Sequence, residues 1–160
     1  MKHLNEQILL SLTPASVLTA DKSVKTLMED FDFLESWEDR YRFIIELGEE
    51  LEPLSPEEKT RETKVKGCVS QVWLISNVEP GTPPHISFRG DSDAHIVRGL
   101  IAILLRLFNH KSAQEILKTD ARQVFQLLGL DAHLSLQRSN GLSAMVRRIQ
   151  DDATTLLAMM

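Results

Sequence analysis

Cysteine is almost absent from this chain: a single thiol, Cys68, stands among 160 residues. A lone cysteine excludes an internal disulfide and suits a reducing compartment, so we expect a cytoplasmic protein. It also excludes an iron–sulfur cluster held within one chain, which usually takes four thiolates. A zinc site would need further ligands, and His85 and His95 are the candidates to gather with Cys68. We give that metal site little weight, because the histidines are scattered without paired spacing.

Long apolar runs and excess positive charge are also missing. No stretch approaches the roughly 20 apolar residues that a membrane-spanning helix needs, so no membrane partner is expected. The apolar segment 8–12 is too short and too poorly formed for a signal peptide. The net charge of −5 argues against a nucleic-acid partner, for which a basic face would be expected. Because the first helix is predicted to begin at residue 23, we expect residues 1–22 to form a loosely ordered N-terminal extension. Residues 23–160 are expected to form one domain.

The composition, with 42% hydrophobic and 26% charged residues, is that of a globular protein. Apolar spacing and capping residues predict helices at 23–34, 36–48, 94–108, 112–117, 120–128 and 142–157, with a loop at Asn140-Gly141. Strands are predicted at 63–65, 69–78 and 84–88, and short turns make neighbouring strands antiparallel. The fold class is therefore α+β, a small antiparallel three-stranded sheet with helices packed mainly on one face.

Cys68 lies at the junction of two predicted strands, which places it on a loop. The commonest role of a lone cysteine is that of a small buried apolar residue with an inert thiol. Here Gly67 precedes it and allows a turn that a partner can approach closely. Lys64 and Lys66 would favour the thiolate if the fold brings them near. These features favour a reactive thiol at Cys68.

Three short motifs in fixed order carry a resemblance to a known family. They are Gly67-Cys68-x-Ser70-Gln71-Val72-Trp73; Gly90-Asp91-Ser92-Asp93-Ala94-x-Ile96-Val97-x-Gly99-Leu100-Ile101-Ala102; and Arg138-Ser139-Asn140-Gly141-Leu142-x-Ala144-Met145. From about Phe31 to about Ile149 the chain resembles the SufE family of sulfur-acceptor proteins, which includes the similar CsdE proteins. Val69, His95 and the long N-terminal segment depart from the family pattern, and none of them removes a group that the chemistry needs.

The resemblance implies a sulfur acceptor and activator of a pyridoxal-phosphate cysteine desulfurase of the SufS or CsdA kind. Cys68 would be the nucleophile that takes persulfide sulfur and passes it to an iron–sulfur scaffold complex of the SufBCD kind. The chain would need no cofactor of its own, because the pyridoxal phosphate belongs to the desulfurase. We expect apolar neighbours to shield Cys68 in the free protein and docking to expose it. A homodimer is left open.

Other residues of the motifs are assigned on weaker grounds. Asp91 and Asp93 are most simply helix caps, and the resemblance adds a partner-facing role. Arg138 is either a solvated charge ahead of a helix or a group that approaches the cysteine loop or the partner. Trp73 is expected to pack rather than to recognise a ligand. We treat a further set as surface contacts only: His95, Arg98, Lys64 and Lys66.

Other functions remain open from the sequence. A CsdE-type protein would feed a different sulfur-transfer pathway. A stand-alone thiol enzyme, such as a Cys–His hydrolase or a peroxidase, would turn over a small substrate without a partner. A pure interaction module would regulate a desulfurase while the thiol is incidental. We favour the persulfide carrier. Because such a carrier transfers sulfur only together with a desulfurase, the sequence does not decide whether the chain is an enzyme in its own right.

Overall fold

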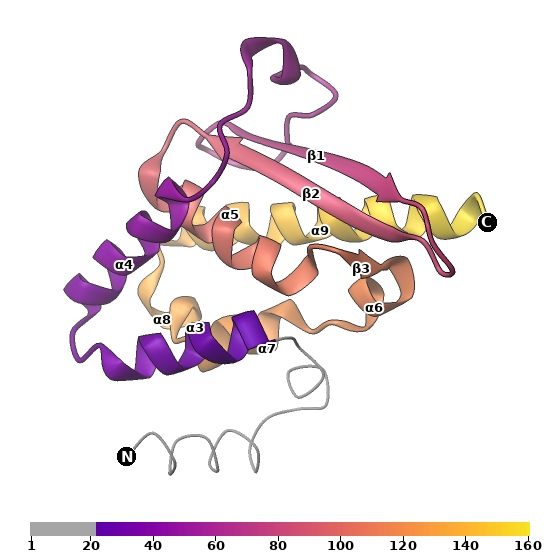
Figure 1. Cartoon of the computed structure of the whole chain (residues 1–160). Coiled ribbons are helices and arrows are strands. Elements are labelled where there is room, and N and C mark those ends of the chain that lie inside the picture. The colour runs from indigo at the N-terminus through magenta and orange to yellow at the C-terminus, as the bar shows by residue number, and fades with distance from the viewer. Residues whose placement is uncertain (1–21) are drawn as a thin grey trace.

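The computed structural model describes residues 22–160, so the predicted extension at 1–22, apart from Lys22, lies outside the described residues. A three-stranded antiparallel sheet, in the order β1-β2-β3, is combined with helices in an α+β fold, as predicted. Figure 1 shows the long β1–β2 hairpin lying over α5 and α9, with α3, α4, α7 and α8 beyond them. Within the described part of the chain no helix is long and apolar enough to cross a membrane.

The elements follow one another along the chain in a simple order. They are α3 (Lys22–Phe33), α4 (Trp37–Glu49), the 3-10 turn η1 (Pro56–Glu58), β1 (Val72–Glu79), β2 (His85–Ser92), α5 (His95–Phe108), β3 (Lys111–Ser112), α6 (Ala113–Lys118), α7 (Ala121–Leu127), α8 (Leu130–His133) and α9 (Leu136–Ala158). Ser36 accepts a hydrogen bond from the Asp39 amide and starts α4 where the sequence predicts it.

The third strand differs from the prediction. The segment 63–65 forms only an isolated bridge, Lys64 with Trp73, whereas the two residues of β3 pair with β2. The predicted strand at 84–88 is β2, the one at 63–65 is wrong, and β3 was missed because a two-residue strand has no alternation to detect.

The core lies between the sheet and the most hydrophobic helix, α5. Val72 and Leu74 of β1 are buried on the helix-facing side of the sheet. On β2, a Cβ added at Gly90 would come within 2.7 Å of Ile101 on α5, so strand and helix are in direct contact there. Most side chains of α5 are buried, as its broad apolar face predicts. This packing makes the start of β1 and the end of β2 a rigid support for the segment that precedes β1.

Candidate functional site

Cys68 lies on a short loop that is closed by backbone hydrogen bonds. The Val65 amide donates to the Val72 carbonyl at 2.8 Å, and the Leu74 amide donates to the Thr63 carbonyl at 2.8 Å. Gly67 turns the chain with a φ of +93°, a left-handed conformation that residues with a side chain seldom adopt. The segment 66–71, called the cysteine loop below, is therefore a tight excursion from the edge of the sheet. The prediction that Cys68 lies on a loop is confirmed.

Helix α9 forms the floor under this loop. The thiol sulfur of Cys68 lies 3.6 Å from the carbonyl oxygen of Gly141, to which the S–H donates a weak hydrogen bond. A Cβ added at Gly141 would lie 3.6 Å from that sulfur, and one added at Gly67 would lie 3.3 Å from the Cβ of Ala144. Gly141 and Ala144 are three residues apart on one face of α9. These small residues let the loop lie close against the helix.

A cavity of about 360 Å³ opens beside the sulfur. Its lining is Cys68, Val69, Ser70, Val72, Val97, Leu100, Ser135, Gln137, Arg138, Gly141 and Met145. Cys68 itself is half-buried, whereas the next residue, Val69, is 75% exposed. The sulfur is thus covered on its helix side and borders a space that a partner can enter.

Burial raises the pKa of the Cys68 thiol above its ordinary value. Lys64 and Lys66 were expected to favour the thiolate, but they line a different hollow, whose lining does not include Cys68. Burial is the one cause of this shift, so the two lysine charges do not favour the thiolate as the sequence led us to expect. Burial therefore favours the neutral thiol over the thiolate in the free protein.

Arg138 lines the same cavity as Cys68, in the first turn of α9. Ser135 caps that helix by accepting a hydrogen bond from the Arg138 amide at 3.2 Å. The prediction of a loop at Asn140-Gly141 is wrong, since α9 begins at Leu136 and runs straight through both residues. The positive end of a long helix and one guanidinium therefore lie near the cavity.

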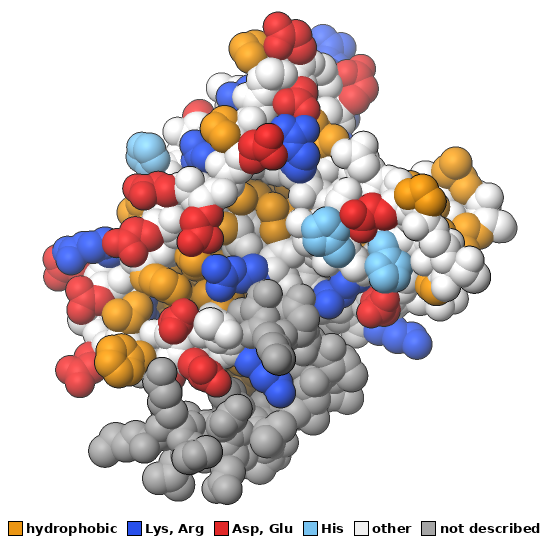
Figure 2. Space-filling view, in the orientation of Figure 1, with side chains coloured by type: hydrophobic (Ala, Val, Ile, Leu, Met, Phe, Trp, Pro, Cys, Tyr) orange, Lys and Arg blue, Asp and Glu red, His pale blue; other side chains and the backbone are white. Residues whose placement is uncertain are grey.

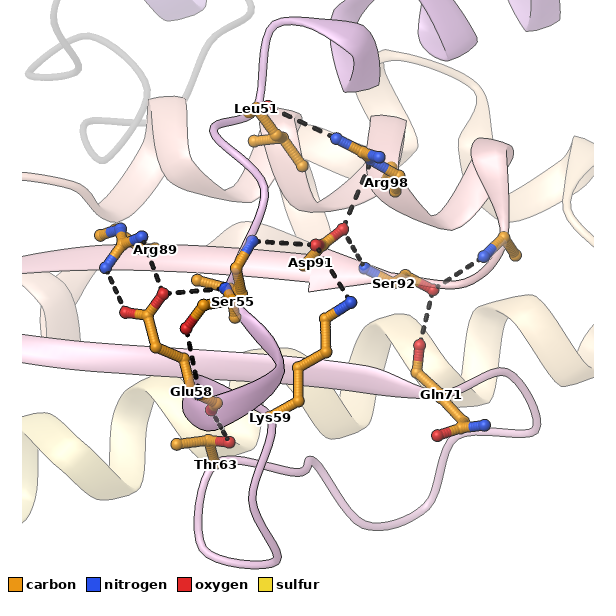
Figure 3. Close-up of polar contacts among 12 residues, drawn as sticks. Leu51, Ser55, Glu58, Lys59, Thr63, Gln71, Arg89, Asp91, Ser92 and Arg98 are labelled. Atoms are coloured by element: carbon orange, nitrogen blue, oxygen red, sulfur yellow. Dashed lines mark hydrogen bonds and ion pairs between the residues drawn. The ribbon is translucent and has the colours of Figure 1, made fainter.

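Asp91 and Asp93 do not cap α5, whose N-cap residue Ala94 has no side-chain hydrogen bond. Asp91 is only 3% exposed and forms ion pairs with Lys59 at 3.7 Å and Arg98 at 3.5 Å. Its carboxylate also accepts hydrogen bonds from the Leu54 and Ser92 amides, as Figure 3 shows. A residue so enclosed has almost no surface for a partner, so Asp91 supports the site from within.

Asp93 and Ser92 hold the end of the cysteine loop through Gln71. The Asp93 carboxylate accepts a hydrogen bond from the Gln71 amide at 3.0 Å. The Ser92 hydroxyl donates to the Gln71 carbonyl at 2.7 Å (Figure 3). Gln71 lies three residues after Cys68, so the motif at Asp91 to Asp93 fixes where the cysteine loop rejoins β1.

Two residues that matter to the site were not identified from the sequence. Gly141 and Ser135 were not selected because Gly is an ordinary loop signal and Ser135 lies just outside the third motif. Trp73 is 9% exposed, with the Lys59 ammonium 4.9 Å from its ring centroid, so its expected packing role is confirmed. Arg98, expected to be a surface contact, instead forms an ion pair with the buried Asp91.

Among the described residues, no histidine lines the cavity beside the thiol. His85 lies on β2 opposite Glu79 of β1, next to the hairpin turn, at the end of the hairpin away from the cysteine loop. The lining of the Cys68 cavity includes no histidine, and among residues 22–160 no group of three or more His, Cys, Asp or Glu could hold a metal ion. The structure does not bring together the Cys68, His85 and His95 set.

Comparisons with known proteins identify the family of this chain. The family model described as SufE, the Fe-S metabolism associated domain, matches residues 25–153. A protein described as an uncharacterized SufE-like protein from Rhizobium etli is 53% identical over 133 residues, covering 82% of this chain and 89% of that protein. A second protein so described, from Rhizobium meliloti, is 49% identical over 132 residues, covering 82% and 94%. The solution structure of a hypothetical protein from Thermus thermophilus matches the fold with a TM-score of 0.69 at 20% identity, over 88% of this chain and 99% of that one.

Proposed function

Because this chain belongs to the SufE family, which is associated with Fe–S metabolism, we propose that it accepts persulfide sulfur on Cys68 from a cysteine desulfurase. The observation that carries the proposal is the position of the only thiol. Cys68 is on a loop, in contact with α9 through Gly141, and beside a cavity open to a partner.

The transfer is a thiol–persulfide exchange. The Cys68 thiol first loses its proton, and the thiolate attacks the outer sulfur of the persulfide on the desulfurase cysteine. A new S–S bond forms on Cys68, the old S–S bond breaks, and the desulfurase cysteine leaves as a thiolate that takes up a proton. The sum is one thiol and one persulfide before and after, so no external oxidant or reductant is required.

The raised pKa of Cys68 has a consequence for this step, since the attacking species is the thiolate. In our proposal the free protein keeps the sulfur neutral and covered, and docking supplies the conditions for its ionisation. Arg138 and the N-terminal end of α9 line the same cavity as Cys68, and in our proposal their positive charge favours a negative sulfur once the partner has docked. Arg138 is thus a positioning and electrostatic group in the proposal.

The surface beside the cavity suits a protein partner. Val69, which lines the cavity from the cysteine loop, is 75% exposed, and Leu136 at the start of α9 is 77% exposed. Covering these apolar side chains with a partner would remove their surface from water, which favours association. We propose that the desulfurase covers them, and that the cysteine loop then turns outward on Gly67 to deliver the sulfur into its active site.

The remaining parts of the proposal concern partners and place. The pyridoxal phosphate is supplied by the desulfurase, of SufS or CsdA type, and the sulfur passes on to an iron–sulfur scaffold complex in the cytoplasm. A gain in mass of one sulfur atom on the intact protein, after incubation with desulfurase and cysteine, tests the acceptor step. Binding without that gain would favour a regulatory interaction module instead.

A further inference from the structure

A second hollow lies at the start of the cysteine loop. It is a groove of about 690 Å³, and its lining shares no residue with that of the Cys68 cavity. Its lining comes from the segment before Cys68 and from α9: Arg61, Glu62, Lys64, Val65, Lys66, Gly67, Ala144, Arg147, Arg148 and Asp151. Residues 61–67 of this lining belong to the segment between η1 and β1, and Figure 1 shows α9 running beneath the sheet. We call this hollow the basic groove.

One cation of the groove is structural. The Arg148 guanidinium donates hydrogen bonds to the Glu62 carbonyl at 2.7 Å and to the Lys64 carbonyl at 3.3 Å, and it pairs with Asp152 at 3.5 Å. Arg148 therefore ties the segment before Cys68 to α9. The shape of the basic groove is fixed by these contacts.

The other cations have no such partner. Within residues 22–160 no carboxylate comes within ion-pair distance of the side chains of Arg61, Lys64, Lys66 or Arg147, all four of which are exposed. By contrast, Arg42, Lys59, Arg89, Arg98 and Arg106 each pair with a carboxylate. Glu62 and Asp151 also line the groove and only partly offset its charge.

This positive charge stands out on an acidic chain with a net charge of −5. Much of the acidic surplus lies elsewhere, and Figure 2 shows Asp and Glu side chains gathered over α3 and α4. Unpaired cations collected at one place on such a chain are the complement of an acidic partner surface, and they raise its rate of association.

We propose that the basic groove binds an acidic, extended segment of the desulfurase and so sets the cysteine loop opposite the donor persulfide. This inference rests on the proposed function for the identity of the partner. The lining of the groove includes Gly67, the residue that directly precedes Cys68. A segment bound in the groove would therefore lie beside the residue next to the nucleophile. The cations of the groove touch no reacting atom, and their role is positioning.

The test uses charge reversal of two exposed residues, Lys66→Glu and Arg147→Glu, singly and together. Arg122→Glu on α7 is the matched control, because Arg122 is exposed, lies outside the groove and undergoes the same change of charge. Circular dichroism and thermal unfolding verify the fold of each variant. Labelled hexaglutamate is the first probe, with anisotropy measured at about 10 mM and about 150 mM salt.

We expect each groove reversal to weaken hexaglutamate binding about fivefold, the double variant to lose more, and Arg122→Glu to bind like the wild type. Desulfurase binding should weaken in the same order. Saturating desulfurase should restore sulfur loading of Cys68 in every variant. Unchanged binding of peptide or desulfurase by the groove variants would overturn the inference.

The same samples also test two other possible occupants of the basic groove. A thymidine oligonucleotide of equal charge that binds the wild type as tightly as hexaglutamate would overturn the choice of an acidic protein segment. A wild-type dimer that the reversals convert to monomer would assign the groove to a second copy of this chain. If wild-type Cys68 gains no sulfur while desulfurase binding still depends on the groove, the proposed function fails and the groove assignment stands.

Discussion

The sulfur of Cys68 rests 3.6 Å from the carbonyl oxygen of Gly141, on the helix beneath the cysteine loop. The contact joins residues 73 positions apart in the chain and closes the bottom of the site. It leaves the thiol partly covered, with a raised pKa, yet beside an open cavity. The first prediction concerns this contact.

A side chain larger than a methyl group at residue 141 should push the cysteine loop away from α9. In Gly141→Ala the new methyl group would lie in ordinary contact with Cys68, 3.6 Å from the sulfur, and alanine favours the helix by roughly 1 kcal/mol. We expect that variant to fold at least as stably as the wild type. Gly141→Val has no room for its branches, so it should displace Cys68 and speed alkylation by iodoacetamide several-fold. A Gly141→Val rate equal to that of the wild type would contradict this account of the contact.

The reactivity of Cys68 should depend on pH in a shifted range. Burial raises the thiol pKa in the folded protein, so the midpoint of the alkylation profile should lie above the value of roughly 8.5 for a free cysteine. The same profile in denaturant should return to the free value. Because the folded pKa is raised, Cys68 contributes stability that is complete below the unfolded pKa and is lost as pH rises through the folded pKa. A folded midpoint below that of the denatured protein would show that nearby cations outweigh burial.

Substitution of Gly67 should strain the turn before Cys68. Its φ of +93° is unfavourable for alanine, and the added Cβ would lie 3.3 Å from Ala144 on α9. We expect Gly67→Ala to lower the free energy of unfolding by about 1–2 kcal/mol, measured by urea denaturation. Ser143→Ala, on an exposed position of the same helix, serves as the control. An unaffected free energy of unfolding would mean that the turn relaxes at no cost.

Asp91 and Asp93 should differ in what their loss does. Asp91→Asn leaves a buried site without its carboxylate and leaves the half-buried Arg98 without its charge partner, so we expect the free energy of unfolding to fall by about 2–3 kcal/mol. Asp93→Ala removes only the hydrogen bond to the exposed Gln71 amide. It should leave stability within about 1 kcal/mol of the wild type and raise the alkylation rate of Cys68, because the end of the loop is released. The reverse pattern would show that these roles are misassigned.

Patterns with a clear period were the ones that predicted the fold well. The helix expected at 94–108 is α5, His95–Phe108, because a continuous apolar face over four turns has one interpretation. The cysteine loop was predicted from Gly67 and the strand that follows it, features that act within a few residues. The three motifs were enough to identify the family, because each is a short run of consecutive positions and their order along the chain is fixed.

What failed depended on contacts between distant segments. Asn140-Gly141 has the composition of a loop, yet both residues lie inside α9, where Gly141 packs against Cys68 from a distant part of the chain. Asp91 has the spacing of a cap, yet it is drawn inward by Lys59 and Arg98, which are 32 and 7 residues away. No local pattern encodes either partner.

Intact-mass spectrometry of the protein after incubation with its desulfurase and cysteine tests the central claim most directly. The measurement compares the wild type with Cys68→Ser, which keeps the shape of the residue and, by circular dichroism, should keep the fold. We predict that the wild type gains the mass of one sulfur atom, which a reductant removes, and that Cys68→Ser gains none and no longer stimulates the desulfurase. A wild type that binds the desulfurase without gaining sulfur, or a Ser variant that stimulates it equally well, would contradict the account.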